Sequence, residues 1–156
     1  MKHARFVHVA LVALALGLAG IAAGVQAAPV AFTVLLTGEQ RVPAVTDQSA
    51  ATASARFTYD ARTRVITWDL DYSGVRSAVT AAQLRGPAMP GKNARALVKL
   101  GGVARKGVQI ASPIKGQATL SPRQAKYVTD GNVYVVLDST DHPNGELRGQ
   151  LLVPKG

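Results

Sequence analysis

The sequence predicts an all-β fold, an antiparallel sandwich or barrel with one short helix. Residues 65–72 alternate strictly, with Ile66, Trp68, Leu70 and Tyr72 on one face and mostly polar side chains on the other. This is the pattern of a strand that buries one face and exposes the other. Similar short segments recur along the chain, with turn residues between them. Only one segment has the start and stop signals of a helix. Both observations favour an antiparallel β architecture.

The expected strands are short and rich in β-branched or alternating residues. The turn between the second and third is expected at Asp60-Ala61-Arg62-Thr63, a four-residue hairpin connection. We expect nine strands, over residues 30–37, 50–59, 65–72, 79–85, 94–100, 108–110, 116–120, 132–138 and 146–153.

The single expected helix is Pro122–Thr129. Ser121 supplies a capping hydroxyl immediately before Pro122, and proline is favoured at the first helical position. Asp130-Gly131 supplies the stop signal. We therefore expect a short helix packed over one end of the sheets.

Residues 1–27 have the organisation of a secretory signal peptide. Lys2 and Arg5 precede an uncharged run from residue 9 to 25, and Val25-Gln26-Ala27 places small residues where a signal peptidase reads them. We expect cleavage before Ala28 and a single domain over residues 28–156. An uncleaved membrane anchor is the alternative, although the run is at the short limit for crossing a bilayer. The expected location is the periplasm or the outside of the cell, without a membrane anchor after cleavage.

Composition excludes several classes of function. Two of the 18 Lys and Arg residues and none of the 9 acids lie within residues 1–27, so residues 28–156 carry 16 basic and 9 acidic side chains, a net charge of +7. The basic residues are spread out and not interleaved with aromatic ones, so the sequence predicts no specific nucleic-acid binding. There is no cysteine, and His142 is the only histidine after residue 27.

Three segments carry a resemblance to a known family. They are residues 36–43 (LTGEQRVP), residues 80–88 (TAAQLRGPA) and residues 131–151, which contain HPNGELRGQL. Together they resemble the opening, central and closing motifs of the chordin-type (CHRD) domain family, over nearly all of the chain after residue 27. The resemblance implies a β-sandwich of immunoglobulin-like or superoxide-dismutase-like character. It implies little about activity.

The departures from the family pattern concern its polar positions. The resemblance places a glutamate where this chain has Arg41, a His-x-His pair where it has Gln83 and Arg85, and a further histidine where it has Asp138. Side chains at i and i+2 of a strand share a face, so two histidines there could bind a metal, whereas arginine cannot. We therefore predict no zinc or copper at this position. If the strands keep the family's arrangement, the Arg85 guanidinium should pair with Asp138 or Glu146.

Other candidate chemistry centres on the closing motif. Asp138, Asp141, His142 and Glu146 flank a turn and provide an alternative metal site. Glu146 and Arg148, two residues apart, are interpreted as ion-paired neighbours on one strand face. A hydrolase would need Ser139 or Ser121 to meet His142 and an acid, without a sequence signature for it. Asp69 and Asp71 could mark a glycosidase pair or a calcium site, but we interpret them as the exposed face of their strand.

These observations lead to three hypotheses. The first is an exported, non-enzymatic domain that acts as a binding or structural module without a cofactor. The second is a metal-binding domain that uses the acidic turn. The third is a weak binder of anionic polymers through its basic surface. The partner would be an extracytoplasmic protein or an anionic polymer. The residues singled out from the family motifs are Arg41, Gln83, Arg85, Asp138, His142, Glu146 and Arg148, and they are called the polar cluster below.

Overall fold

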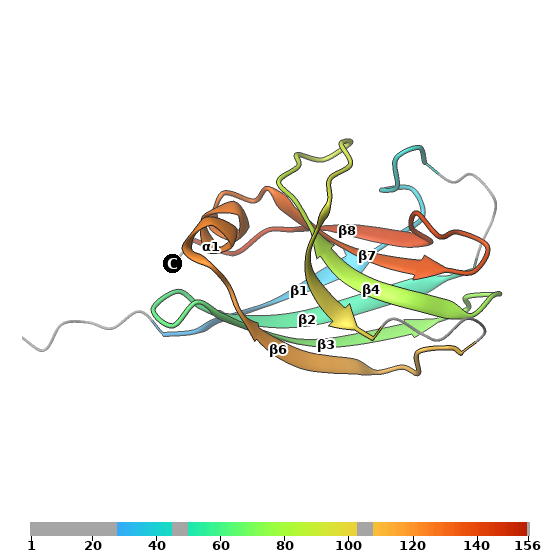
Figure 1. Cartoon of the computed structure of the whole chain (residues 1–156), viewed down its shortest axis with the longest axis horizontal. Coiled ribbons are helices and arrows are strands. Elements are labelled where there is room, and N and C mark those ends of the chain that lie inside the picture. The colour runs from blue at the N-terminus through green and yellow to red at the C-terminus, as the bar shows by residue number, and fades with distance from the viewer. Residues whose placement is uncertain (1–27, 45–49, 103–107, 156) are drawn as a thin grey trace, which may run out of the picture.

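The computed structural model describes residues 28–44, 50–102 and 108–155, and its architecture is a sandwich of two four-stranded antiparallel sheets (Figure 1). The strand order is β1-β2-β3-β6 in the first sheet and β5-β4-β7-β8 in the second. The predicted signal peptide, residues 1–27, lies outside the described residues. The elements are β1 (Val30–Leu36), β2 (Thr52–Asp60), β3 (Val65–Ser73), β4 (Val79–Arg85), β5 (Ala96–Gly101), β6 (Ile114–Thr119), α1 (Pro122–Thr129), β7 (Val133–Ser139) and β8 (Leu147–Leu151).

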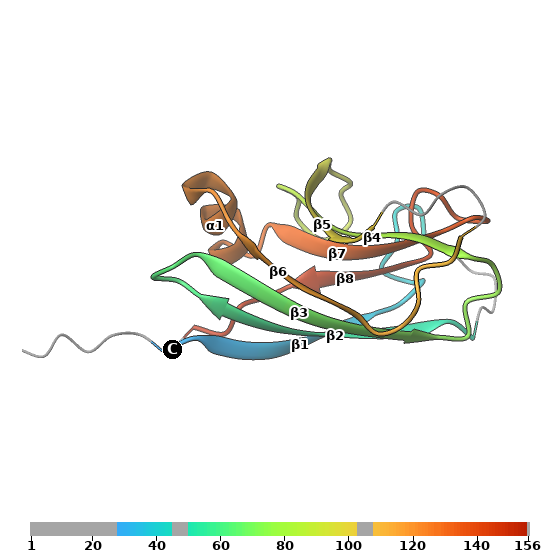
Figure 2. The same ribbon diagram turned by 60° about the horizontal axis from the view of Figure 1, so that its bottom comes forward.

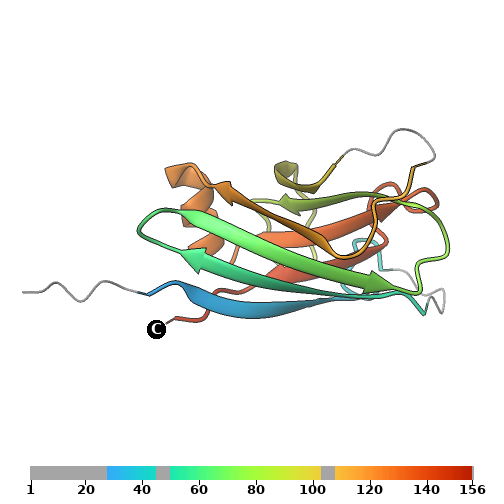
Figure 3. The same cartoon turned by 90° about the horizontal axis from the view of Figure 1, so that it is seen from below.

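The core lies between the two sheets, which Figures 2 and 3 show as separate layers. Strand β3 supplies Ile66, Trp68 and Leu70, all buried, while Tyr72 is half-buried. On β8, Leu147, Gly149 and Leu151 are buried against the first sheet. The predicted all-β sandwich and the predicted inward face of residues 66–72 are therefore confirmed, because the period of two decides which side chains leave water.

Both pairs of sheet edges are joined. On one side the backbones of Thr37 and Arg148 exchange two hydrogen bonds, of 2.9 and 3.1 Å, which link the end of β1 to β8. On the other side the Trp68 indole N–H donates to the Leu100 carbonyl on β5, at 3.0 Å. The Trp68 ring reaches that carbonyl across Gly116 of β6, where no side chain obstructs it.

The helix begins and ends where the sequence predicts. Ser121 Oγ accepts from the Gln124 backbone N–H and the Gln124 side chain accepts from the Ser121 N–H, a capping box that completes the first turn. Asp130 is the C-cap, and Gly131 follows with a φ of +73°, a conformation in which a side chain would be strained. Helix α1 covers one end of the sandwich (Figure 1).

Residues 108–110 do not form the predicted strand. Their contacts are too few for a ladder: the Ile110 N–H donates to the Val79 carbonyl at 2.9 Å, and the Ile110 carbonyl accepts from the Tyr72 hydroxyl. Ser112-Pro113 follows at once, and proline lacks the N–H that a ladder needs. The next strand begins at Ile114 instead of the predicted 116, and β5 begins at Ala96 instead of 94.

Candidate functional site

The polar cluster lies on the outer face of the second sheet, away from the core. Alternation turns Leu84, Val135 and Leu137 inward, so their strand neighbours point outward, and the register sets Gln83 beside Val136 and Val136 beside Arg148. Every residue of β7 is nevertheless buried. The outward side chains of β7 are therefore covered too. Part of this cover is the connection between β4 and β5, whose Ala88 packs against Tyr134 and Val136.

Arg85 and Asp138 form an ion pair across β4 and β7. Arg85 Nη2 lies 3.0 Å from Asp138 Oδ2, and Arg85 Nε donates to Gln83 Oε1 at 3.1 Å. The structure thus brings together the three residues that the family resemblance placed close to one another. The contact uses one guanidinium nitrogen, so the pair is not bidentate, and Asp138 Oδ1 has no hydrogen-bond partner among the described residues.

Arg41 approaches the same carboxylate from the segment after β1. A Cβ atom on Gly145 would lie 4.0 Å from both Arg41 Nε and Asp138 Oδ1, so both side chains border this glycine, and the Arg41 charge acts on the Asp138 carboxylate. Gly145 has a φ of +121°, which strongly favours glycine. Arg41 Nη1 is buried and has no hydrogen-bond partner among the described residues.

Burial dominates the electrostatics of Asp138. Its side chain is 5% exposed, and this loss of water raises the pKa of Asp138 to about 6, although Arg85 and then Arg41 act in the opposite direction. The carboxyl group is therefore ionised at neutral pH and becomes protonated as the pH falls below about 6. The ion pair between Arg85 and Asp138 therefore exists at neutral pH and is lost when Asp138 becomes protonated.

Arg148 is more deeply buried than the other two arginines, at 3% exposure. Its guanidinium carbon lies 3.8 Å from the centre of the Tyr134 ring, a cation–π contact. Arg148 Nη2 donates over long distances, 3.5 Å to the Met89 carbonyl and 3.4 Å to Gln150 Oε1, and Nη1 has no partner among the described residues. Burial lowers the pKa of Arg148.

The predicted ion pair between Glu146 and Arg148 is wrong. Glu146 precedes β8 and accepts a 2.7 Å hydrogen bond from Ser139 Oγ, while Arg148 turns over Tyr134. The i, i+2 rule holds only where both residues belong to the strand. Alternation along each strand places Tyr134 and Arg148 on outward faces, but their contact depends on the register of β7 with β8, which the sequence alone does not give.

The acidic turn does not converge as a metal site. His142 Nε2 lies 3.7 Å from Glu146 Oε2, but the Asp141 backbone N–H donates to Ser77 Oγ in a separate contact. No group of three or more His, Cys, Asp or Glu side chains in residues 28–44, 50–102 and 108–155 is arranged to hold a metal ion. Asp138 belongs instead to the pair with Arg85.

The contacts around Ser139 also differ from those of a hydrolase. Glu146 Oε2 lies between the Ser139 hydroxyl and the His142 imidazole, whereas a catalytic triad requires the imidazole in the middle. Ser139 is fully buried. On the opposite sheet, Asp69 pairs with Lys115 at 2.8 Å and Asp71 is exposed, which agrees with the interpretation of an exposed strand face.

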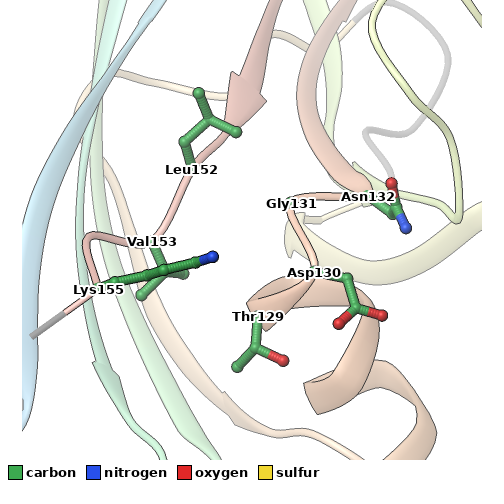
Figure 4. Close-up of a pocket in the computed structure, with 7 residues that line it drawn as sticks. All are labelled: Thr129, Asp130, Gly131, Asn132, Leu152, Val153 and Lys155. Carbon is green, nitrogen blue, oxygen red and sulfur yellow. The ribbon is translucent and has the colours of Figure 1, made fainter.

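An open groove lies apart from the polar cluster, at the end of the sandwich that α1 covers (Figure 4). It has a volume of about 490 Å³ and separates the end of the helix from the C-terminal segment. The helix stop signal Asp130-Gly131 and the start of the closing motif, Gly131 and Asn132, line it, but none of the residues of the polar cluster does. Its lining residues are Thr129, Asp130, Gly131, Asn132, Leu152, Val153 and Lys155.

The described residues contain no helix long and apolar enough to cross a membrane. No curated protein and no solved structure matches the sequence. The family model of the CHRD domain, however, matches residues 32–151. This range contains both sheets except the first two residues of β1, together with the helix and every residue of the polar cluster. The chain therefore belongs to the CHRD domain family.

Proposed function

We propose that this chain is an exported, non-enzymatic CHRD-domain protein that acts outside the cytoplasm as a binding or structural module. Its partner would be an extracytoplasmic protein or an anionic polymer. The observation that carries the proposal is the ion pair of Arg85 with Asp138, 3.0 Å apart. The pair occupies the positions at which the family resemblance implies histidines.

The physical reason is that fixed charge replaces the groups that would do chemistry. Arginine stays protonated throughout the physiological pH range, so it neither ligates a metal nor transfers a proton at neutral pH. Asp138 is engaged by Arg85, and Gln83 accepts from the same guanidinium. The Arg85 guanidinium thus takes the place that a bound cation could occupy. The β-sandwich then serves to bind a partner and not to hold a metal.

Metal content tests the proposal. Residues 28–156, produced without added metal, dialysed and measured by elemental analysis, should hold no stoichiometric zinc or copper. The matched control is the triple variant Gln83→His, Arg85→His and Asp138→His, which restores the implied histidines and should gain metal affinity. One tightly held equivalent of metal in the unmodified protein would overturn the proposal.

Export is tested separately. Protein recovered from outside the cytoplasm of the producing cell should have an N-terminus near Ala28, as measured by intact mass. An intact Met1 on extracytoplasmic protein would contradict cleavage.

A further inference from the structure

Two guanidinium groups in the polar cluster, of the half-buried Arg41 and the buried Arg148, each have one nitrogen that donates to no protein group. Arg41 Nη1 and Arg148 Nη1 are both inaccessible to water and lack a hydrogen-bond partner among the described residues. Of the acids in that part of the chain, only Asp138 forms an ion pair with Arg41, Arg85 or Arg148, and the pair is with Arg85. Asp138 also lies near Arg41, but Arg148, at 3% exposure, forms no ion pair within the described residues. A buried charge without a counter-charge is unfavourable, so a second anion would stabilise this face.

Both arginines lie in one layer, between β7–β8 and two covering segments. Residues 37–44 bring Arg41, and their backbone pairs with Arg148 through Thr37. The connection between β4 and β5, which rises from the sandwich in Figure 1, covers Arg148 with Met89. The two covering segments are joined by one side-chain bond, from Asn93 Nδ2 to the Val42 carbonyl at 2.8 Å.

The floor of this layer is apolar. Tyr134 and Val136 of β7 pack with Ala88 of the β4–β5 connection, and all three are buried. Gly145 lies against Val136, and a Cβ atom there would come within 2.9 Å of its side chain. The layer is therefore a low-dielectric environment, in which a charge-assisted hydrogen bond is stronger than at an exposed surface.

We infer that Arg41 and Arg148 bind an oxyanion, a carboxylate or a phosphate, in the layer between β7–β8 and the covering segments. This inference rests on the proposed function as a binding module and names its ligand class. A guanidinium donates to both kinds of oxyanion, and a metal cation would be repelled. Asp138 acts as a competitor, because its carboxylate lies beside Arg41.

The test measures anion affinity on residues 28–156. Acetate and inorganic phosphate are titrated by calorimetry at constant ionic strength, with chloride as the reference anion. We expect saturable binding to at least one of the two, and the stronger one identifies the ligand class. Arg41→Gln and Arg148→Gln should each weaken binding at least tenfold. The matched control is Arg62→Gln, because Arg62 is 64% exposed on the β2–β3 turn and should leave the affinity unchanged.

A further variant separates binding from a merely structural role. Asp138→Asn removes the competing carboxylate and should tighten anion binding severalfold, which a structural role of the arginines would not predict. If Arg148→Gln fails to fold, Arg41→Gln and Asp138→Asn still decide the question. Equal affinities for Arg41→Gln and Arg62→Gln, or a response that follows ionic strength alone, would overturn the inference. If anion binding fails in this way but the protein holds no metal, the inference is wrong and the proposed function stands. If the protein holds stoichiometric zinc or copper, the proposed function is wrong.

Discussion

Substitution of Gly116 by alanine tests how the edge of the sandwich is closed. A Cβ atom at this position would lie 2.6 Å from Trp68 Cζ2 and 2.9 Å from Cε2. Carbon atoms in contact prefer a separation of about 3.5–4.0 Å, so the indole ring must move by about 1 Å. That movement would stretch the bond from Trp68 Nε1 to the Leu100 carbonyl, now 3.0 Å, beyond hydrogen-bond length.

The expected destabilisation follows from these two effects. Overpacking of a core site costs about 1–3 kcal/mol. Loss of the hydrogen bond adds about 0.5–1.5 kcal/mol. Replacement of a strand glycine returns roughly 0.5–1 kcal/mol through chain entropy. Gly116→Ala should therefore lower the free energy of unfolding by about 2 kcal/mol, since packing and hydrogen bonding together outweigh the gain from entropy.

Urea denaturation followed by tryptophan fluorescence measures both parts, because Trp68 is the only tryptophan. The native emission should shift to longer wavelength as the indole gains exposure, and the urea midpoint should fall. Gly102→Ala is the matched control, since a Cβ there meets nothing within 4 Å. A Gly116→Ala variant with the native emission and a midpoint equal to that of the control would refute the reasoning.

Two further predictions concern the second sheet. The ionised Asp138 carboxylate is less stable in the fold than in water, because its folded pKa is about 6 against an ordinary 3.8. The free energy of unfolding should therefore fall as pH rises from about 4 to 6, by on the order of 3 kcal/mol, relative to Asp138→Asn. Identical pH profiles from denaturant titrations of the two proteins would exclude this burial effect. Gly149→Ala would bring a Cβ within 2.5 Å of the Leu35 carbonyl oxygen and force β8 away from β1. Its melting temperature, measured by circular dichroism, should fall below that of Gly102→Ala, and an equal value would contradict the close approach.

The sequence by itself determined the fold class, the helix and the family. The period of two in residues 66–72 selects the buried face, because successive side chains of a strand point to opposite sides. Ser121 and Gly131 set the limits of the helix through local hydrogen bonding and backbone freedom. These features depend on neighbours in the chain and can therefore be read from it.

The tertiary structure alone decided which partner each polar residue takes. Local spacing suggested Glu146 for Arg148, but the register of β7 with β8 and the covering β4–β5 connection place Tyr134 beneath its guanidinium. Arg41 and Asp138 both border Gly145 although they are nearly a hundred positions apart in the chain, and no periodicity encodes such proximity. Alternation fixes the face on which a side chain lies. The contacts on that face depend on register and on loops, and these are set by the packing of the whole domain.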